Sequence, residues 1–374
     1  ADGKTGDGAG IHVEIPQDFF ADAIHIGGDA SVDSQIAVGM IFLPKTDIAA
    51  QERCRQIIES EILAFGYAIY GWRQVPINTD CIGEKANATR PEIEQILIRN
   101  TPGTEEDAFE RDLYVIRRRI EKSAIANQVD LYVCSLSCRS LIYKGMFLAE
   151  HLTEFYPDLL DPRFVSRFAI YHQRYSTNTF PTWKLAQPFR RLAHNGEINT
   201  ISGNVNWMKS HETRLADPIL DPYMDDLKPV VQAQGSDTAC FDNVFELLTF
   251  AGRDAPMARC LMVPASMGGN SAMPQRHRDM YSYCNAVMEP WDGPAAICAT
   301  DGRWMVAGLD RSGLRPLRYT VTGSGLLIVG AETGMVKVPE ADIVSRGRLG
   351  PGQSLALDLK TAKLYSNEEL LDEL

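Results

Sequence analysis

The order of strand-like and helix-like patterns in this sequence predicts an α+β fold in which helices cover antiparallel sheets. Strand-like apolar runs open the sequence, helical patterns dominate its middle, and further strand-like runs close it. The sequence has no sustained β–α–β alternation, the pattern that indicates a parallel doubly wound sheet. An Asp301-Gly302 pair between two apolar runs adds a hairpin signal, which is typical of antiparallel pairing.

The first elements are two strands and a helix. Residues 11–15 alternate in polarity as a strand does, and residues 35–43 form a second apolar run. Asp47 is a suitable N-cap for a helix over residues 48–65, where Ile57, Ile58, Ile62 and Phe65 share one face.

The next segments are less uniform. Residues 67–91 combine Gly, Pro and Asn with aromatic residues, which indicates an ordered connection and not a flexible linker. Residues 105–125 have helical spacing, although residues 113–116 could equally pair as a strand. Residues 131–137 and 167–174 are predicted strands.

Helices follow in the middle and strands at the end. Apolar residues recur three and four positions apart in segments 201–215, 238–251 and 276–289. Two strands then flank Asp301-Gly302, which predicts a type I′ turn. The strands expected in this last part cover residues 295–300, 303–309, 317–320, 326–331 and 354–359.

Composition limits the class of protein. The 374 residues are 45% hydrophobic and 23% charged, which permits a sizeable core in one large domain or in two to three smaller ones. The net charge of −12 argues against nucleic acid as a partner, because phosphate binding needs a basic surface. No apolar run is long enough for a membrane helix and no secretory signal opens the sequence, so no membrane partner is expected. The scattered cysteines, which lack disulfide-like spacing, indicate a cytoplasmic protein.

The cysteines and the short motifs exclude several kinds of site. No C-x-x-C pair occurs among the eight cysteines, so neither a zinc nor an iron–sulfur site is expected in the chain, and the thiols should be reduced and mostly buried. The motifs G-x-S-x-G, H-E-x-x-H and G-x-x-x-x-G-K-[ST] are absent. The glycines of T-G-D-G-A-G at 5–10 resemble a phosphate loop only loosely, and a tight turn is the preferred interpretation.

Two segments carry the chemistry. The first is Y-H-Q-R-Y-S-T-N-T-F-P-T-W at 171–183 and the second is H-N-G-E-I-N-T at 194–200. Each alone is weak evidence, because an Asn-Gly pair is usually only a turn. Together they resemble the class II glutamine amidotransferases, a branch of the N-terminal-nucleophile hydrolases.

Further motifs extend this resemblance over essentially all of residues 1–374, as one domain that resembles the glutaminase domains of glutamate synthase large subunits. The resemblance implies a four-layer α/β/β/α sandwich of two antiparallel sheets with its first strand missing. The motifs are G-D-G-A-G at 6–10, G-W-R-Q-V-P at 71–76, A-N-A-T-R-P-E-I-E-Q at 86–95, L-I-Y-K-G-M at 141–146 and D-R-S-G-L-R-P-L-R-Y at 310–319.

The resemblance implies two substrate-binding residues. Arg174 should hold the α-carboxylate of glutamine, since a planar guanidinium can bind both oxygens. Asp237 should bind the α-ammonium group of the same ligand.

The resemblance also implies two catalytic residues. The side-chain N–H of Asn195 and the backbone N–H of Gly196 should form an oxyanion hole. His194 and Glu197 are expected only to support this loop, and His172 is expected to be a core histidine and not a base. No metal is expected.

The nucleophile of the family has no counterpart in the sequence. It is a cysteine at the mature N-terminus whose α-amine acts as the base, whereas residue 1 here is Ala. The chain is therefore interpreted as a fragment, an artificially shortened chain, or a natural pseudoenzyme, and the 374 residues alone should be inactive.

The expected function is ammonia release from glutamine for transfer to 2-oxoglutarate in a synthase domain of the same polypeptide. The resemblance assigns FMN and an iron–sulfur cluster to the complete enzyme and no cofactor to this domain, and it adds an electron-donating small subunit as a further partner. Two alternatives stay open: a glutamine-binding regulatory module, and another class II amidotransferase that delivers ammonia to a sugar or a phosphoribosyl group.

Overall fold

The chain folds into two compact units, which are described separately. The computed structural model describes residues 6, 8–25, 35–173, 181–232, 235–268 and 273–374. Unit 1 comprises residues 1–190 and 218–228, and unit 2 comprises residues 191–217 and 229–374.

Unit 1 contains a four-stranded sheet of order β3-β4-β2-β5 and a three-stranded sheet of order β6-β1-β7. All of its strand pairings are antiparallel among the described residues. Its elements are β1 (Ala9–Glu14), α1 (Gln17–His25), β2 (Ile36–Leu43), α2 (Ile48–Ala64), β3 (Ala68–Gln74), α3 (Glu84–Ala88), β4 (Glu92–Arg99), α4 (Glu106–Ala126), β5 (Tyr132–Ser137), β6 (Ser140–Gly145), α5 (Leu152–Phe155), β7 (Ala169–Gln173) and α7 (Met224–Leu227).

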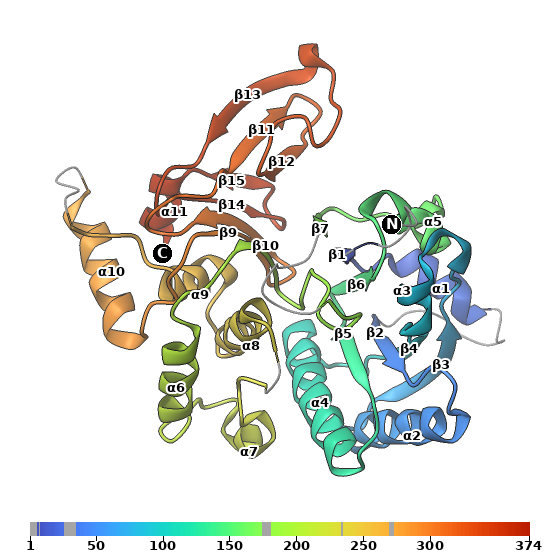
Figure 1. Ribbon diagram of the computed structural model, residues 1–374. Coiled ribbons are helices and arrows are strands. Elements are labelled where there is room, and N and C mark those ends of the chain that lie inside the picture. The colour runs from blue at the N-terminus through green and yellow to red at the C-terminus, as the bar shows by residue number, and fades with distance from the viewer. Residues whose placement is uncertain (1–5, 7, 26–34, 174–180, 233–234, 269–272) are drawn as a thin grey trace. The chain divides into compact units, whose positions relative to one another are not determined.

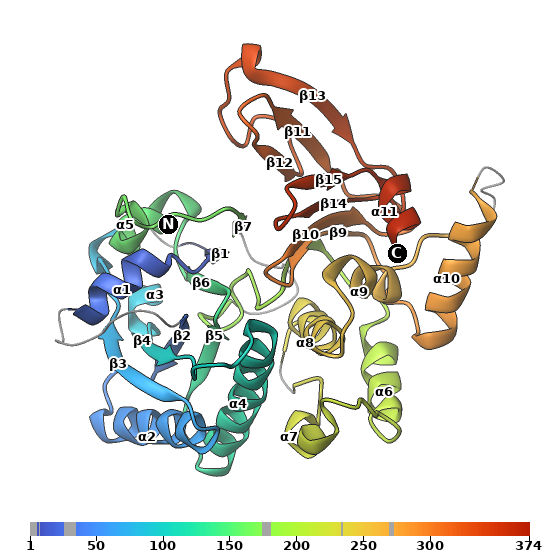
Figure 2. The same cartoon turned by 180° about the vertical axis from the view of Figure 1, so that it is seen from behind.

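Helices α2 and α4 cover one face of the four-stranded sheet (Figures 1 and 2). The opposite face packs on residues of β1, β6 and α1. All eight residues of β2 are buried, because this strand is covered on both faces. As predicted, the side chain of Asp47 caps α2 by accepting a hydrogen bond from the Ala50 N–H at 2.8 Å.

Three of the sequence motifs of unit 1 contribute to one polar cluster in its core. Asp158, which is 5% exposed, accepts bonds from the Arg73 guanidinium at 2.6 and 2.7 Å and from the Tyr143 hydroxyl at 2.9 Å. Gln95 donates to Tyr143 at 2.9 Å and accepts from Arg73 at 2.9 Å. Each of the three motifs therefore supplies a polar side chain that finds its partner in the core of unit 1.

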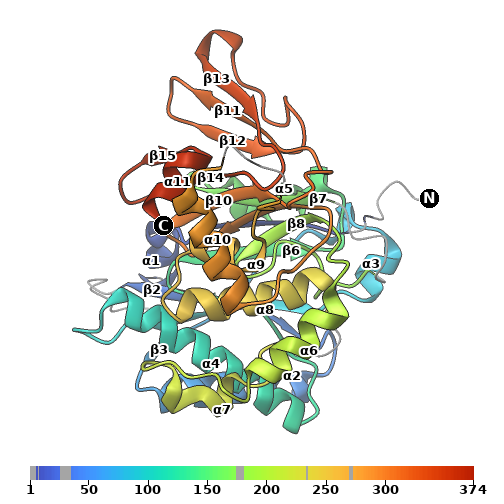
Figure 3. The ribbon, with the colours of Figure 1, turned by 90° about the vertical axis from the view of Figure 1, so that its left-hand side faces the viewer.

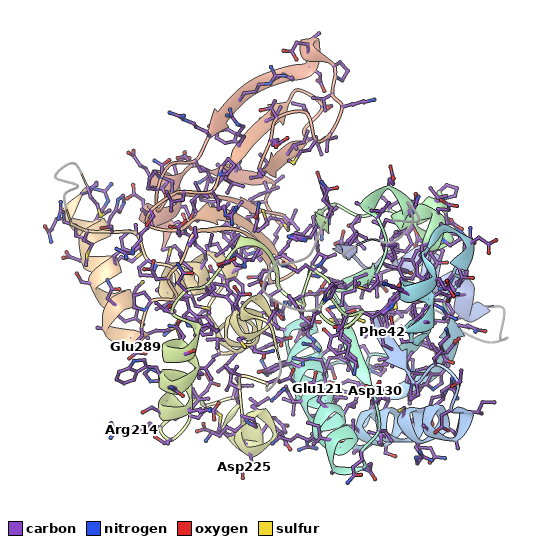
Figure 4. All side chains as sticks on the ribbon, viewed as in Figure 1. Phe42, Glu121, Asp130, Arg214, Asp225 and Glu289 are labelled. Carbon is purple, nitrogen blue, oxygen red and sulfur yellow. The ribbon has the colours of Figure 1, made fainter. Side chains whose placement is uncertain are left out.

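A second ionic cluster fixes the end of unit 1. Glu121 of α4, labelled in Figure 4, accepts from Arg117 at 2.6 Å, Arg118 at 2.8 Å and Arg190 at 3.0 Å. Burial alone would raise the pKa of Glu121, but the surrounding guanidinium groups outweigh it and lower that pKa to about 2. Arg190 also donates to the Val133 carbonyl at 2.6 Å, so the chain is anchored immediately before unit 2 begins.

Unit 2 contains a five-stranded sheet of order β15-β14-β10-β9-β8 and a three-stranded sheet of order β12-β11-β13. Its described strand pairings are also antiparallel. Its elements are β8 (Leu192–Gly196), α6 (Ile201–His211), α8 (Asp237–Phe250), α9 (Ala255–Met262), α10 (Gln275–Val287), β9 (Ala295–Thr300), β10 (Trp304–Leu309), β11 (Arg318–Thr322), β12 (Leu327–Gly330), β13 (Ile343–Arg348), β14 (Ser354–Asp358), β15 (Lys363–Tyr365) and α11 (Asn367–Glu373).

Helices α8 and α9 lie side by side against the five-stranded sheet (Figure 3), where α8 contacts β8 and α9 contacts β10. Apolar residues on the sheet, among them Ala296, Ala307 and Leu355, pack instead against Tyr319 and Val329 of the smaller sheet. The prediction of an α+β fold with antiparallel sheets is therefore confirmed.

Several local predictions need correction. The hairpin of β9 and β10 forms as expected, but its turn is not type I′, because Gly302 has a positive φ of 92° and Asp301 does not. The carboxylate of Asp301 closes the turn instead, by accepting the N–H groups of Arg303 at 2.9 Å and Trp304 at 2.7 Å. Gly10 lies inside β1 and not in a tight turn. A Cβ there would lie 2.6 Å from the Lys144 Cβ, so close approach of two strands requires glycine.

Other differences concern element type. The segment 67–91 is ordered, but it contains the strand β3 and the helix α3 where only a connection was expected. The segment 105–125 is the continuous helix α4, so the strand alternative for residues 113–116 is wrong. No helix of the described residues combines the length and hydrophobicity needed to cross a membrane.

Candidate functional site

The candidate oxyanion hole lies at the end of β8. Asn195 is exposed and Gly196 is partly buried at the last two positions of this strand. Gly196 has a φ of +143°, and a Cβ there would lie only 1.7 Å from the Pro294 carbonyl oxygen. Both the backbone conformation and the lack of space therefore require glycine at this position.

The strand register determines where the Gly196 N–H points. In an antiparallel pair, hydrogen-bonded and non-hydrogen-bonded partners alternate. The bonds from Thr300 to the Arg191 carbonyl (2.8 Å) and from Glu197 to the Pro294 carbonyl (3.1 Å) identify two hydrogen-bonded pairs. Gly196 faces Ala295 at a position between them, so its N–H points away from β9. Because β8 is the outer strand of this sheet in the described part of the chain, that N–H is directed toward the sheet's open edge.

The loop after β8 is held through its backbone. The N–H of Asn199 donates to the Asp292 carbonyl at 2.8 Å, and the N–H of Thr200 donates to the same oxygen at 3.3 Å. The N–H of Ile198 instead donates to the Asp237 carboxylate at 2.9 Å. The loop therefore reaches the start of α6 in a defined conformation.

Asp237 is the first residue of α8 and is partly buried beside this loop. One of its carboxylate oxygens binds the Ile198 N–H, and the other accepts the N–H of Thr238 at 2.7 Å. The preceding Ser236 caps the helix by accepting the Ala239 N–H at 3.1 Å. A carboxylate in the first helical turn is stabilised by the helix dipole, so a negative charge is favoured at this point.

The supporting residues have the following places. His194 is 4% exposed, and its Nδ1 lies 3.0 Å from the Thr238 hydroxyl, which links β8 to α8. Glu197 takes part in the loop through its backbone bond to Pro294. His172 lies in β7 and is only partly buried, so it is not the fully buried core histidine that was predicted.

The structure thus brings Asp237 to the loop that carries Asn195 and Gly196, although about forty residues of chain separate them. Arg174, the expected carboxylate-binding residue, lies outside the described residues. Nothing in the sequence pointed to Asp292 and Pro294, whose carbonyls hold the loop, because any residue can supply a backbone oxygen.

The cysteines are unsuited to nucleophilic attack. Seven of the eight are buried, and Cys298 is partly buried. Desolvation by burial raises the pKa of Cys54, Cys240 and Cys298 to about 11. Since the thiolate is the nucleophile, such thiols are inert near neutral pH.

The described residues offer no group of three or more His, Cys, Asp or Glu side chains that could hold a metal ion. They therefore do not fit an iron–sulfur cluster, whose irons require several thiolates at one place.

Comparisons with known proteins point in one direction. The sequence family described as "Glutamine amidotransferases class-II" matches residues 1–374. The chain is 62% identical to the glutamate synthase [NADPH] large chain of Azospirillum brasilense, covering 100% of this chain and 25% of that protein. It is 41% identical to the ferredoxin-dependent glutamate synthase 2 of Synechocystis sp., covering 99% of this chain and 24% of that protein.

Among solved structures, the chain is similar to one titled "Structure of the allosteric regulatory enzyme of purine biosynthesis". The TM-score is 0.36 and the identity is 18%, over 61% of this chain and 40% of the other. The chain spans about a quarter of the length of the curated relatives named above.

Proposed function

Because the chain belongs to the class II glutamine amidotransferases, we propose that residues 1–374 form the glutaminase domain of a glutamate synthase and release ammonia from glutamine. The observation that carries this proposal is the position of the Asp237 carboxylate beside the Asn195-Gly196 loop, where it accepts the Ile198 N–H at 2.9 Å. A site for a free amino acid needs a fixed anion next to the groups that act on the side chain, and Asp237 supplies that anion.

The substrate would be held by its α-carbon groups. Asp237 binds the α-ammonium group, and Arg174 binds the α-carboxylate through two parallel hydrogen bonds. A pair of side chains of opposite charge would select an amino acid over an uncharged amide. Each charged hydrogen bond contributes about 1.5–3 kcal/mol.

The reacting amide oxygen would lie at the open edge of β8. Attack on the amide carbon converts this oxygen into an anion, which accepts hydrogen bonds from the Gly196 N–H and the Asn195 side-chain N–H. Donors that are already in place stabilise the anion without reorganising during the reaction. The direction of the Gly196 N–H, away from β9, supports this role.

The nucleophile in this proposal is a cysteine with a free α-amine, supplied from outside residues 1–374. Its thiol proton passes to the α-amine, and the sulfur forms a bond to the amide carbon. The carbon–nitrogen bond then breaks, and the nitrogen leaves as ammonia after taking up that proton. Water hydrolyses the resulting thioester and releases glutamate. The burial of the described cysteines supports this assignment.

The complete protein would use the ammonia elsewhere. We assign the reductive formation of glutamate from ammonia and 2-oxoglutarate to a synthase domain of the same polypeptide, located in the cytoplasm. FMN and the iron–sulfur cluster belong to that domain, and an electron-donating small subunit is a further partner. The coverage of about a quarter of each relative supports the presence of other domains.

The test compares two asparagines of the same loop. In the full-length polypeptide, Asn195→Ala should lower kcat for ammonia release by roughly 10²–10³ through loss of one oxyanion donor. Asn199→Ala is the matched control, because Asn199 is also exposed and holds the loop only through its backbone N–H. It should retain near-wild-type activity.

Ammonia and glutamate are measured together with glutamine binding by calorimetry. Equal losses in the two variants would refute the oxyanion role of Asn195. A wild-type polypeptide that binds glutamine without releasing ammonia would refute the enzymatic proposal in favour of a glutamine-binding module.

A further inference from the structure

The segment that leads into β9 acts as a rigid support for the loop after β8. Its carbonyls at Asp292 and Pro294 accept the N–H groups of Asn199 (2.8 Å), Thr200 (3.3 Å) and Glu197 (3.1 Å). The N–H of Asp292 in turn donates to the Thr200 hydroxyl at 2.9 Å. These four hydrogen bonds join the loop to this segment.

Two glycines remove any space between them. A Cβ at Gly196 would lie 1.7 Å from the Pro294 carbonyl oxygen, and a Cβ at Gly293 would lie 1.9 Å from the Glu197 carbonyl oxygen. Because the two backbones are in direct contact, residues 292–294 cannot move toward Gly196 without displacing it.

The position of this support is set by two neighbouring residues of the sequence motif at 310–319. The carboxylate of Asp310, which is 1% exposed, accepts the Ala295 N–H at 2.9 Å. Arg311 binds the carboxylate of Asp292 with two hydrogen bonds, at 2.9 Å from Nε and 2.8 Å from Nη2. Asp310 therefore fixes the start of β9, and Arg311 fixes the residue whose carbonyl holds the loop.

The Arg311–Asp292 pair is suited to orientation more than to stability. Its side chains are 54% and 30% exposed, and ion pairs of such exposure contribute little to folding. Two parallel hydrogen bonds nevertheless allow only one orientation of the carboxylate. Hydrogen bonding to Arg311 lowers the pKa of Asp292, so the pair stays charged near neutral pH.

We propose that Arg311, acting through Asp292, is a positioning residue for the oxyanion-binding loop. It does not bind glutamine. It holds the Asp292 carbonyl where it receives the Asn199 and Thr200 N–H groups, and the loop then presents the Gly196 N–H at the edge of β8. This inference rests on the proposed glutaminase function, since it states how that site is kept in register.

The experiment uses Arg311→Ala in the full-length polypeptide. A displaced donor weakens binding of the transition state more than binding of glutamine, whose α-carbon groups bind elsewhere. We therefore expect kcat for ammonia release to fall roughly 10- to 100-fold, with KM for glutamine little changed. Guanidinium at low millimolar concentration should restore part of kcat by binding the Asp292 carboxylate in place of the Arg311 side chain. Sodium chloride at the same concentration should not.

Arg346→Ala is the matched control. Arg346 also forms an exposed ion pair with two hydrogen bonds, from Nη1 and Nη2 to Glu340 at 2.7 and 2.6 Å. It lies on β13 of the same unit and is 43% exposed. This variant should retain kcat and show no response to guanidinium. Equal kcat in the two variants, or a loss in Arg311→Ala that appears only in KM, would overturn the proposal.

Amide hydrogen exchange separates this inference from the proposed function. In the full-length polypeptide, exchange at Asn199 and Thr200 should accelerate in Arg311→Ala and stay unchanged in Arg346→Ala. Unchanged exchange in Arg311→Ala would refute the positioning role even in an active enzyme. Absence of wild-type ammonia release would refute the glutaminase function, while the exchange result would still decide whether Arg311 holds the loop.

Discussion

The carboxylate of Asp237 and the backbone N–H of Ile198 are joined by a 2.9 Å hydrogen bond, which fixes the first turn of α8 to the loop after β8. This bond occupies one carboxylate oxygen, and the Thr238 N–H binds the other at 2.7 Å. The second oxygen also accepts the Thr238 hydroxyl at 3.3 Å, whereas the oxygen bound to Ile198 keeps a further lone pair that can accept an ammonium hydrogen. The same residue can therefore order the loop and bind a ligand.

Asp237→Asn separates these two roles. The amide oxygen of Asn can still accept the Ile198 N–H, so the loop should keep its conformation. The amide NH2 group then replaces the oxygen that accepts the Thr238 N–H, which costs one bond at the start of α8. Loss of the charge removes a charge-assisted bond to the α-ammonium group, which contributes about 1.5–3 kcal/mol. The dissociation constant of glutamine, measured by calorimetry on the full-length polypeptide, should rise roughly 10- to 100-fold.

The control for this change is Asp342→Asn. Asp342 is also a partly buried carboxylate that accepts a backbone N–H, from Ser324 at 3.0 Å, but it lies beside β13. Its substitution should leave glutamine affinity unchanged. If Asp237→Asn bound glutamine as tightly as this control, the ammonium-binding role would be incorrect.

Gly196→Ala should abolish ammonia release and reduce stability. The added Cβ would lie 1.7 Å from the Pro294 carbonyl oxygen, and the φ of +143° is unfavourable for alanine. The segment and the loop must separate, which displaces the Gly196 N–H. Thermal unfolding and ammonia release in the full-length polypeptide measure the two effects.

Gly203→Ala provides the comparison. Gly203 lies inside α6, where a new Cβ would meet no atom within 4 Å. Alanine favours a helix over glycine by about 0.5–1 kcal/mol, so this variant should unfold at the same or a higher temperature. A Gly196→Ala variant that matched Gly203→Ala in both measurements would contradict the close contact on which the site depends.

The sequence predicted the elements that are determined by neighbouring residues. It missed elements that form because of tertiary contacts. The cap at Asp47 and the apolar face of α2 are properties of consecutive residues, and both are present. The strand β3 was missed because Gly71 and flanking polar residues weaken its pattern. It forms because β4 offers a partner edge, with an irregular register near Gly71.

The sequence predicted the candidate loop after β8 and its neighbour Asp237, but not the residues that support the loop. Polar residues in H-N-G-E-I-N-T indicated a functional loop, and Asp237 is adjacent to it as the family resemblance implied. The turn at Asp301-Gly302 followed a different geometry, because the Asp301 carboxylate binds two N–H groups and so replaces the type I′ backbone. The type of turn thus depends on competing side-chain hydrogen bonds, which a prediction from the Asp-Gly pair alone does not include.

The buried thiols predict a simple titration. Burial raises the pKa of Cys54, Cys240 and Cys298 to about 11, and that of Cys134 and Cys284 to about 12. At pH 8 the folded chain should therefore react slowly with a disulfide reagent, because the thiolate fraction is small and access is limited. All eight cysteines should react quickly after unfolding in urea.

Raising the pH tests whether the raised thiol pKa values cause the slow reaction. Reaction of the folded chain should accelerate as pH rises toward the thiol pKa values, provided that circular dichroism shows the fold intact. Rapid labelling of several thiols at pH 8 in the folded chain would contradict the burial of these side chains.

The core cluster around Asp158 predicts a large loss of stability in unit 1. Asp158→Ala removes the two carboxylate oxygens that bind Arg73, at 2.6 and 2.7 Å. It also removes the acceptor of the Tyr143 hydroxyl. The Arg73 side chain is only 19% exposed and keeps its charge, so water replaces the lost bonds poorly. Removing one partner of a buried pair costs about 3–5 kcal/mol. Because the full cost assumes complete burial, we expect the lower part of this range, measured as a reduced midpoint of urea unfolding.

Asp161→Ala is the matched control, since Asp161 follows three residues later and binds Arg163 with two bonds, at 2.9 and 2.6 Å. Arg163 is 48% exposed and also contacts Asp22, so water and this second carboxylate compensate for the loss of Asp161. The urea midpoint should therefore barely change. Similar midpoints for the two alanine variants would mean that Asp158 does not stabilise the core of unit 1, and that the motifs which meet there serve another purpose.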